Sequence, residues 1–206
     1  MDTPSSQQDE QVVGHPLLAA KLSVPVVRIP VVERPRLLAL VSRGVEGPLT
    51  VVSGPPGAVK SLLLVSWILT GAAPGPVAWL TLDEYDDHPG VFWAYVIAAL
   101  RRAGAELPEE VGEPIHAERV DRSLLTRNAH SLADRDVPLV LVLDQADCVT
   151  HPDIRADLDF VLRHASTGLR LVLLTRQEAP LRLHRYELDG QLVHVSGAAL
   201  SFSPEE

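Results

Sequence analysis

Eight residues, Gly-Pro-Pro-Gly-Ala-Val-Lys-Ser at positions 54–61, combine glycines with a lysine and a serine at a spacing suited to phosphate binding. Backbone N–H groups of such a loop, together with those of the helix that follows, surround phosphate oxygens. Lys60 is suited to neutralise the outer phosphates, and the Ser61 hydroxyl is suited to bind Mg²⁺. The candidate nucleotide-binding residues of this loop are Gly54, Gly57, Ala58, Val59, Lys60 and Ser61.

Val59 departs from the usual phosphate-loop pattern, in which a glycine stands directly before the lysine. If this position requires a left-handed backbone, any side chain costs about 1–2 kcal/mol there, and a β-branched one is especially unsuited. Two interpretations follow from this departure. Either the site binds nucleotide with reduced affinity, or the chain keeps a P-loop fold whose site no longer binds it.

A second set of candidate residues follows two apolar runs further along the chain. Asp144 ends the run at 139–143, as in a Walker B strand, whose aspartate helps to hold Mg²⁺. Gln145 stands where many ATP-hydrolysing proteins have a second acid. A glutamine can orient the attacking water but cannot act as its general base, and general-base catalysis is worth roughly 10²- to 10⁴-fold in rate. Arg176 is either a sensor of the terminal phosphate or an ordinary charge at a strand end. The candidate catalytic residues are Asp144, Gln145 and Arg176, and the candidate metal ligands are Ser61 and Asp144.

The acidic segment at 83–88, Asp-Glu-Tyr-Asp-Asp-His, has two interpretations of its own. It either helps to hold Mg²⁺ or a catalytic water, or forms a solvated loop. The histidines lack metal-ligand spacing, so no zinc site is predicted. The single cysteine, Cys148, excludes an internal disulfide and is expected to be a small buried side chain in a reducing compartment.

Composition excludes several classes of function. The 206 residues carry a net charge of −9, from 18 Lys+Arg against 27 Asp+Glu, which argues against a broad nucleic-acid or anionic-membrane surface. No uncharged apolar run is long enough to predict a membrane span, and the polar start is unlike a signal peptide. We therefore expect a soluble cytoplasmic protein without a membrane partner.

The pattern of apolar runs predicts the elements that position these residues. Strands are expected over 49–52, 77–82, 139–143, 169–175 and 191–195, and helices over 62–69, 89–103, 119–133 and 152–164. Strands alternating with helices indicate a three-layer α/β fold, a P-loop NTPase domain with a mostly parallel sheet. Residues 1–16 are expected to form a disordered tail, and residues 17–206 the domain.

The segment before the first strand is expected to be an extended arm over 17–30, followed by a short helix from Pro35 to near Gly44. Through Val32 and Arg34 this segment either packs beside a nucleotide base or merely covers a sheet edge. At the other end, Ser203-Pro204-Glu205-Glu206 has the form of a helix-capping box with no helix behind it. We therefore expect the chain to be part of a longer protein.

In order and spacing, residues 17–206 resemble the N-terminal nucleotide-binding domain of the large ATP-binding LuxR-type transcriptional regulators, the family of the maltose-regulon activator. The resemblance is carried by Lys21-Leu22 with Pro25, Val32–Leu37, the P-loop with Trp67, Trp79–Glu84, Phe92-Trp93 with Ala98–Leu100, Leu143-Asp144, Leu174–Arg176, Gly190–Leu192 and Leu200–Ser203. Three positions depart from the family pattern: Val59, Gln145, and Asp147, where the family often has histidine.

The resemblance implies a signal-transducing ATPase that alternates between an ADP-bound resting form and an ATP-bound oligomerising form. It implies a sheet order of 5-1-4-3-2, with Arg176 facing the γ-phosphate. It also implies further parts after residue 206: a lid and winged-helix region, a helical-repeat sensor and a LuxR-type helix-turn-helix. The partners implied are ATP or ADP with Mg²⁺, the rest of the protein's own chain, a second copy on self-association, and DNA through the C-terminal part only.

Three functional hypotheses follow. The first is a nucleotide-binding switch domain with weak or absent hydrolysis, at most a slow ATPase, because of Val59 and Gln145. The second is a degenerate P-loop scaffold that mediates protein interactions without nucleotide. The third, a small-molecule kinase or other stand-alone P-loop enzyme, requires an acceptor site and a lid that the sequence does not indicate.

Overall fold

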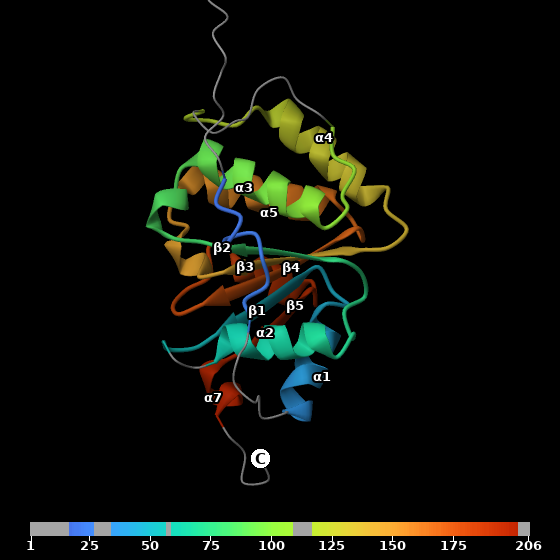
Figure 1. Cartoon of the computed structure of the whole chain (residues 1–206), viewed down its shortest axis with the longest axis vertical. Coiled ribbons are helices and arrows are strands. Elements are labelled where there is room, and N and C mark those ends of the chain that lie inside the picture. Colours follow the sequence, from blue (N-terminus) through green and yellow to red (C-terminus); the bar gives the residue numbers. More distant parts are fainter. Residues whose placement is uncertain (1–16, 27–33, 57–58, 109–116, 202–206) are drawn as a thin grey trace, which may run out of the picture.

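The computed structural model describes residues 17–26, 34–56, 59–108 and 117–201. Within them, a parallel five-stranded sheet lies between two layers of helices (Figure 1). The strands are β1 (Leu49–Ser53), β2 (Val77–Thr81), β3 (Leu139–Asp144), β4 (Leu169–Thr175) and β5 (Leu192–Val195). Their order is β2-β3-β4-β1-β5, which confirms the predicted order 5-1-4-3-2 read from the other edge.

The helices form one layer on each face of the sheet (Figure 1). One face carries α1 (Pro35–Gly44), α2 (Lys60–Leu69) and α7 (Gly197–Leu200). The other carries α3 (Pro89–Arg102), α4 (Arg122–Ala133), α5 (Pro152–His164) and α6 (Leu183–Leu188). Two short 3₁₀ helices, η1 (Glu84–Asp86) and η3 (Ala146–Cys148), follow β2 and β3 at the carboxyl edge of the sheet.

Strand β3 shows why the sequence folds in layers. All its residues are buried. Leu139, Leu141 and Leu143 belong to the core beneath α3–α5, whereas Val140 and Val142 belong to the core beneath α1 and α2. A strand covered on both faces has no polar side, and this explains the uninterrupted apolar run.

Several boundaries differ from the sequence-based expectation. Helix α4 begins at Arg122 rather than near 119, because the Asp121 side chain accepts a hydrogen bond from the Ser123 amide at 2.9 Å and caps the helix there. Helices α6 and α7 were not predicted; both are short and follow strands β4 and β5 with little apolar periodicity. The predicted tail at 1–16 and the capping box at 203–206 lie outside the described residues.

The segment at 17–26 is not the extended arm that its prolines indicated. The amides of Lys21 and Leu22 donate to the carbonyls of Leu18 and Ala19, so residues 18–22 form a compact turn. The Lys21 carbonyl accepts a hydrogen bond from the Thr81 amide at 2.9 Å, which attaches the turn to the end of β2. In Figure 1 the segment, drawn in blue, crosses the sheet at this edge.

Candidate functional site

Those predicted phosphate-binding residues of the loop that the structure describes, Gly54, Val59, Lys60 and Ser61, lie at the carboxyl edge of the sheet, where parallel α/β sheets hold their ligands. The loop after β1 leads into α2, which begins at Lys60. Ser61 Oγ donates a hydrogen bond to Asp144 Oδ2 at 2.7 Å, across the sheet from the end of β3. Strand β4 lies between β1 and β3, and Arg176 directly follows it. A cavity of about 380 Å³ is lined by Pro56, Val59, Lys60, Ser61, Leu62, Asp144, Gln145, Asp147, Leu174 and Arg176.

The Asp144 carboxylate is buried and fully engaged. Besides the Ser61 hydroxyl, it accepts a hydrogen bond from the Gln145 amide at 2.9 Å. Burial raises the pKa of Asp144, and the hydrogen bonds from Ser61 and Gln145 and the charges of Lys60 and Arg176 only partly oppose the rise. A divalent cation beside this carboxylate would favour its charged form.

Lys60 reaches back over the phosphate loop. Its Nζ donates to the carbonyl oxygens of Gly54 at 2.6 Å and Pro55 at 3.1 Å. Burial, reinforced by the charge of Arg176, lowers the pKa of the Lys60 ammonium. Two cations that face one cavity repel each other, and an anion bound between them would relieve that repulsion.

Arg176 is held beside the end of β3 rather than pointing freely into solvent. Its Nη2 donates to Gln145 Oε1 at 2.9 Å, and its backbone N–H donates to Asp147 Oδ1 at 2.9 Å. Gln145, the residue at the second Walker B position, is itself in a left-handed conformation with φ 59°. The structure thus joins two of the predicted catalytic residues to each other, and their role in catalysis stays a prediction.

Val59 precedes α2 with φ 60° and ψ 24°, so the position does require the left-handed backbone that favours glycine. The Val59 side chain is 47% exposed and therefore gains little from burial. The strain of a β-branched residue in this region is not offset by packing.

We expect Val59→Gly to raise the free energy of unfolding by about 1 kcal/mol, because glycine adopts this conformation without the steric cost. Denaturant unfolding measures the change. Val137→Gly is the matched control: Val137 is 49% exposed and has a negative φ, so glycine should destabilise the protein there. A loss of stability at both positions would contradict the strain at Val59.

Arg34, predicted to lie near a nucleotide base, contacts the end of α7. Its Nη1 and Nη2 donate to the carbonyl oxygens of Leu200 and Ser201, both at 2.7 Å. Helix α1 packs on β5 and α2, so it covers that edge of the sheet. A contact of Arg34 with nucleotide stays a prediction, while Val32, Gly57 and Ala58 lie outside the described residues.

The acidic segment at 83–88 makes structural contacts that neither interpretation of the sequence included. Asp83 and Asp86 both bind the ammonium group of Lys21, at 2.6 Å and 2.8 Å. Asp87 accepts hydrogen bonds from the amides of Thr150 and His151, at the start of α5. The segment therefore fastens the turn at 18–22 and α5 to the end of β2.

Two contacts beside the phosphate loop were not anticipated either. Ser53 Oγ and His194 Nε2 lie 2.7 Å apart at the ends of β1 and β5. Gly197, the first residue of α7, lies against the loop: a Cβ atom added there would come 3.4 Å from Gly54 Cα. Only the pairing of β1 with β5 in the folded sheet could have indicated these contacts.

No helix among the described residues combines the length and the apolar character needed to cross a membrane.

Comparison with known proteins supports both the fold and the resemblance, although no family model matches the chain. The HTH-type transcriptional regulator MalT of Serratia proteamaculans (strain 568) is 33% identical over 192 residues, which are 92% of this chain and 21% of that protein. MalT of Cronobacter sakazakii (strain ATCC BAA-894) is 32% identical with the same coverage. The chain thus spans about a fifth of the length of these relatives.

Among solved structures, Cdc6p from Pyrobaculum aerophilum superposes with a TM-score of 0.54 at 18% identity, over 84% of this chain and 47% of that one. This likeness concerns the fold alone. Together with the parallel sheet and its strand order, it confirms a P-loop NTPase fold. With MalT relatives 31–33% identical over 92% of the chain, the predicted resemblance to the nucleotide-binding part of the large LuxR-type regulators is confirmed.

Proposed function

We propose that this chain is a nucleotide-binding regulatory domain that binds ATP or ADP with Mg²⁺ and hydrolyses ATP slowly or not at all. The observation that carries the proposal is the contact of Ser61 with Asp144 in the same cavity as Lys60 and Arg176. Lys60, Ser61 and Asp144 are the side chains that P-loop sites use to bind phosphate and Mg²⁺, and with Arg176 they come from three separate parts of the chain. Charged side chains without a shared function would not be expected to meet in one cavity.

The donors present fit a nucleotide and its metal. The Ser61 hydroxyl and the Asp144 carboxylate are hard oxygen ligands of the kind that Mg²⁺ prefers, so these two residues would hold it. The ion would neutralise charge on the phosphates. Lys60 would exchange its present carbonyl partners, Gly54 and Pro55, for phosphate oxygens, whose negative charge favours the ammonium form.

Slow hydrolysis follows from Gln145. An amide cannot take the proton of an attacking water, and the Gln145 side-chain oxygen already accepts from Arg176. A terminal phosphate would compete with Gln145 for that arginine, and phosphate is the stronger acceptor because it is charged. This competition gives the domain a means of distinguishing ATP from ADP without turnover.

The relatives are named as HTH-type transcriptional regulators, and we extend this role to the longer cytoplasmic protein of which this chain would form the N-terminal domain. DNA would be bound by another part of that protein, since the net charge of −9 does not favour a nucleic-acid surface here. The domain would act on the rest of its own chain and through self-association.

Calorimetric titration with Mg-ATP and with Mg-ADP tests the proposal. We expect saturable binding that Lys60→Ala weakens by about tenfold or more, because a charge-assisted contact to phosphate is worth about 1.5–3 kcal/mol. Arg43→Ala is the control for the loss of one positive charge, since Arg43 is exposed in the last turn of α1. Absence of binding to the parent chain, by heat and by thermal shift, would contradict the proposal.

Val59 favours a second candidate, a scaffold that has kept the fold but not the nucleotide. Its exposed side chain lines the cavity at the position where the pattern has glycine. Nucleotide titration of Val59→Gly separates the two candidates: a weakened site should gain affinity, whereas a scaffold should bind neither nucleotide before or after the change.

A further inference from the structure

A second cavity lies at the opposite edge of the sheet from the nucleotide site. It has a volume of about 650 Å³ and is formed by the last turn of α5, the turn that follows it, helix α6 and the segment before β1. Arg170, the second residue of β4, lines it, whereas Arg176 directly follows the carboxyl end of the same strand. The two cavities thus lie at opposite ends of β4 and share no residue.

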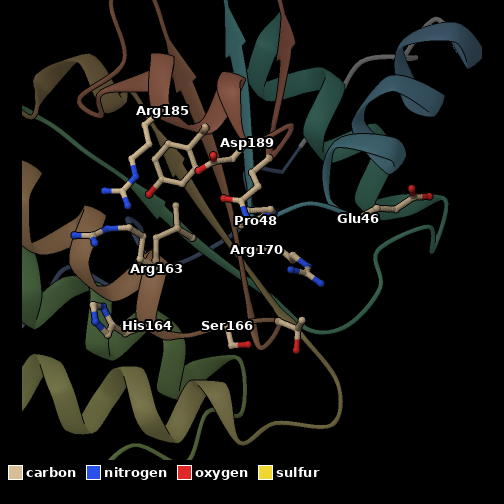
Figure 2. A pocket seen from close by; sticks show the side chains of 12 residues that line it. Glu46, Pro48, Arg163, His164, Ser166, Arg170, Arg185 and Asp189 are labelled. Atoms are coloured by element: carbon tan, nitrogen blue, oxygen red, sulfur yellow. The ribbon is translucent and has the colours of Figure 1, made fainter.

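Arg170 is the unusual feature of this cavity. Its Nε atom is buried and has no hydrogen-bond partner, and no ion pair of the side chain is found among the residues that the structure describes. Figure 2 shows the guanidinium group apart from the two labelled carboxylates, those of Asp189 and of Glu46, and the Glu46 side chain points away from it. Burial lowers the pKa of the Arg170 guanidinium, which still stays protonated at neutral pH.

Arg170 is half-buried, and the desolvation of its Nε atom without a hydrogen-bond partner lowers stability. Arg163, which also lines the cavity, has an acidic partner of its own in Asp159, which is not among the lining residues. Asp159 accepts from Arg163 Nε at 2.9 Å through one oxygen and from the Tyr186 hydroxyl at 2.8 Å through the other. Neither of the two acids that line the cavity, Glu46 and Asp189, forms an ion pair with Arg170, so its charge has no acidic partner among the described residues.

The other groups around the cavity add hydrogen-bond donors. Arg163 and Arg185 stand next to each other on one wall, and His164 lies below them (Figure 2). The side chains of Ser166 and Thr167 line the cavity on the side of the turn. Planar guanidinium groups together with hydroxyls match the oxygens of a phosphate group, and the volume is within the range of about 300–1,000 Å³ found for small-molecule sites.

From this arrangement we infer that the cavity at the amino edge of β4 is a binding site for a small phosphate-bearing molecule, with Arg170 as its central contact. The phosphate group of the ligand would place a negative charge beside the Arg170 guanidinium. The inference does not depend on nucleotide binding at the other edge of the sheet.

The test uses inorganic phosphate as the probe and Lys60→Ala as the parent chain, so that the P-loop does not contribute. Amide NMR signals of residues 166–170 report on the cavity during titration at constant ionic strength. We expect saturable shifts, with affinity about tenfold or more lower in Arg170→Met, since a charge-assisted contact is lost. Arg101→Met is the matched control, because Arg101 donates to the Pro108 carbonyl on another part of the surface.

Thermal unfolding gives a second, independent measurement. Without phosphate, Arg170→Met should melt higher than its parent, because a polar Nε atom that is buried without a partner has been removed. With phosphate, only the parent should gain stability, as a ligand of the native state requires. If the methionine variant fails to fold, Arg170→Lys keeps the charge but loses the planar fork, and its affinity should be intermediate.

Three results would overturn the inference. The first is a phosphate response equal in Arg170→Met and in its parent. The second is a set of shifts that stay linear up to high phosphate concentration, which means weak ionic attraction without a site. The third is tighter binding of poly-glutamate than of phosphate at the same amides, which would assign the cavity to an acidic protein segment.

Discussion

Replacing Lys21 by methionine should lower the free energy of unfolding by about 3–5 kcal/mol, the cost typical of removing one partner of a buried ion pair. Lys21 contacts two carboxylates, with Nζ 2.6 Å from Asp83 Oδ2 and 2.8 Å from Asp86 Oδ2. The side chains of Lys21 and Asp86 are 14% and 2% exposed. Methionine keeps the length of the side chain but leaves the Asp86 charge buried without its cation.

The loss should extend beyond the ion pair because Lys21 holds a whole segment in place. Its carbonyl accepts from the Thr81 amide, and its ammonium group lies 5.1 Å from the centre of the Tyr95 ring. The Tyr95 hydroxyl in turn accepts from the Leu18 amide at 3.2 Å. Hydrogen exchange at Thr81 should therefore become faster in Lys21→Met, as the turn at 18–22 detaches from β2.

Lys21 and Asp83 each make the free energy of unfolding depend on pH, and the sign of each dependence is defined. Burial opposes the charge on Lys21, but hydrogen bonds to Asp83 and Asp86 outweigh it, so the pKa of the Lys21 ammonium lies above 10.5. Its stabilisation is therefore fully present below pH 10.5 and is lost as the pH rises through the folded-state pKa. The hydrogen bond from Lys21 lowers the pKa of Asp83 below 3.8, so that contribution is lost as the pH falls below this value.

Asp83→Asn provides the control. Asp83 is 45% exposed, and an exposed pair is worth only about 0–1 kcal/mol, so this variant should lose much less than Lys21→Met. A loss in Lys21→Met no larger than in Asp83→Asn, measured by denaturant unfolding at neutral pH, would contradict the role assigned to the buried pair.

The sequence alone predicted the sheet and the positions of its strands well, because strands buried on both faces leave uninterrupted apolar runs. It also indicated that Val59 would be strained if the position before the lysine required a left-handed backbone, and the backbone there does have φ 60°. The contact of Ser61 with Asp144 followed from the order of the two motifs, which places both at the carboxyl edge of one sheet.

Contacts that depend on tertiary structure were beyond the sequence. Nothing in the acidic run at 83–88 shows that a lysine more than 60 residues earlier binds two of its carboxylates. The prolines near Lys21 favoured an extended arm, whereas the ion pairs and the Thr81 amide hold a turn there. Arg170 lies in an apolar strand pattern, and only the folded chain reveals that its Nε atom is buried without a partner.

Asp144→Asn should change stability and metal-dependent binding in opposite directions. Burial raises the pKa of Asp144, so at neutral pH the fold carries the cost of a buried carboxylate. Asparagine removes that charge and can still hydrogen-bond with Ser61, so the free energy of unfolding should rise. Altering a residue that hydrogen-bonds to a metal ligand lowers metal affinity by roughly 10- to 100-fold. Because Asp144→Asn removes a ligand itself, the enhancement of nucleotide binding by Mg²⁺ should fall by at least this factor.

The pH dependence distinguishes this explanation from a general change in the site. Because the folded-state pKa of Asp144 lies above 3.8, the contribution of Asp144 to the stability of the parent chain decreases as the pH rises from 3.8 through that pKa. The stability of Asp144→Asn relative to its parent should therefore be greatest above this window and disappear below it. Enhancement by Mg²⁺ should strengthen in the parent over the same window, since a metal ligand must be deprotonated.

Asp147→Asn, in the same cavity, should retain both the parent's stability profile and its response to Mg²⁺; equal effects of the two substitutions would refute the assignment of Asp144 as the metal ligand.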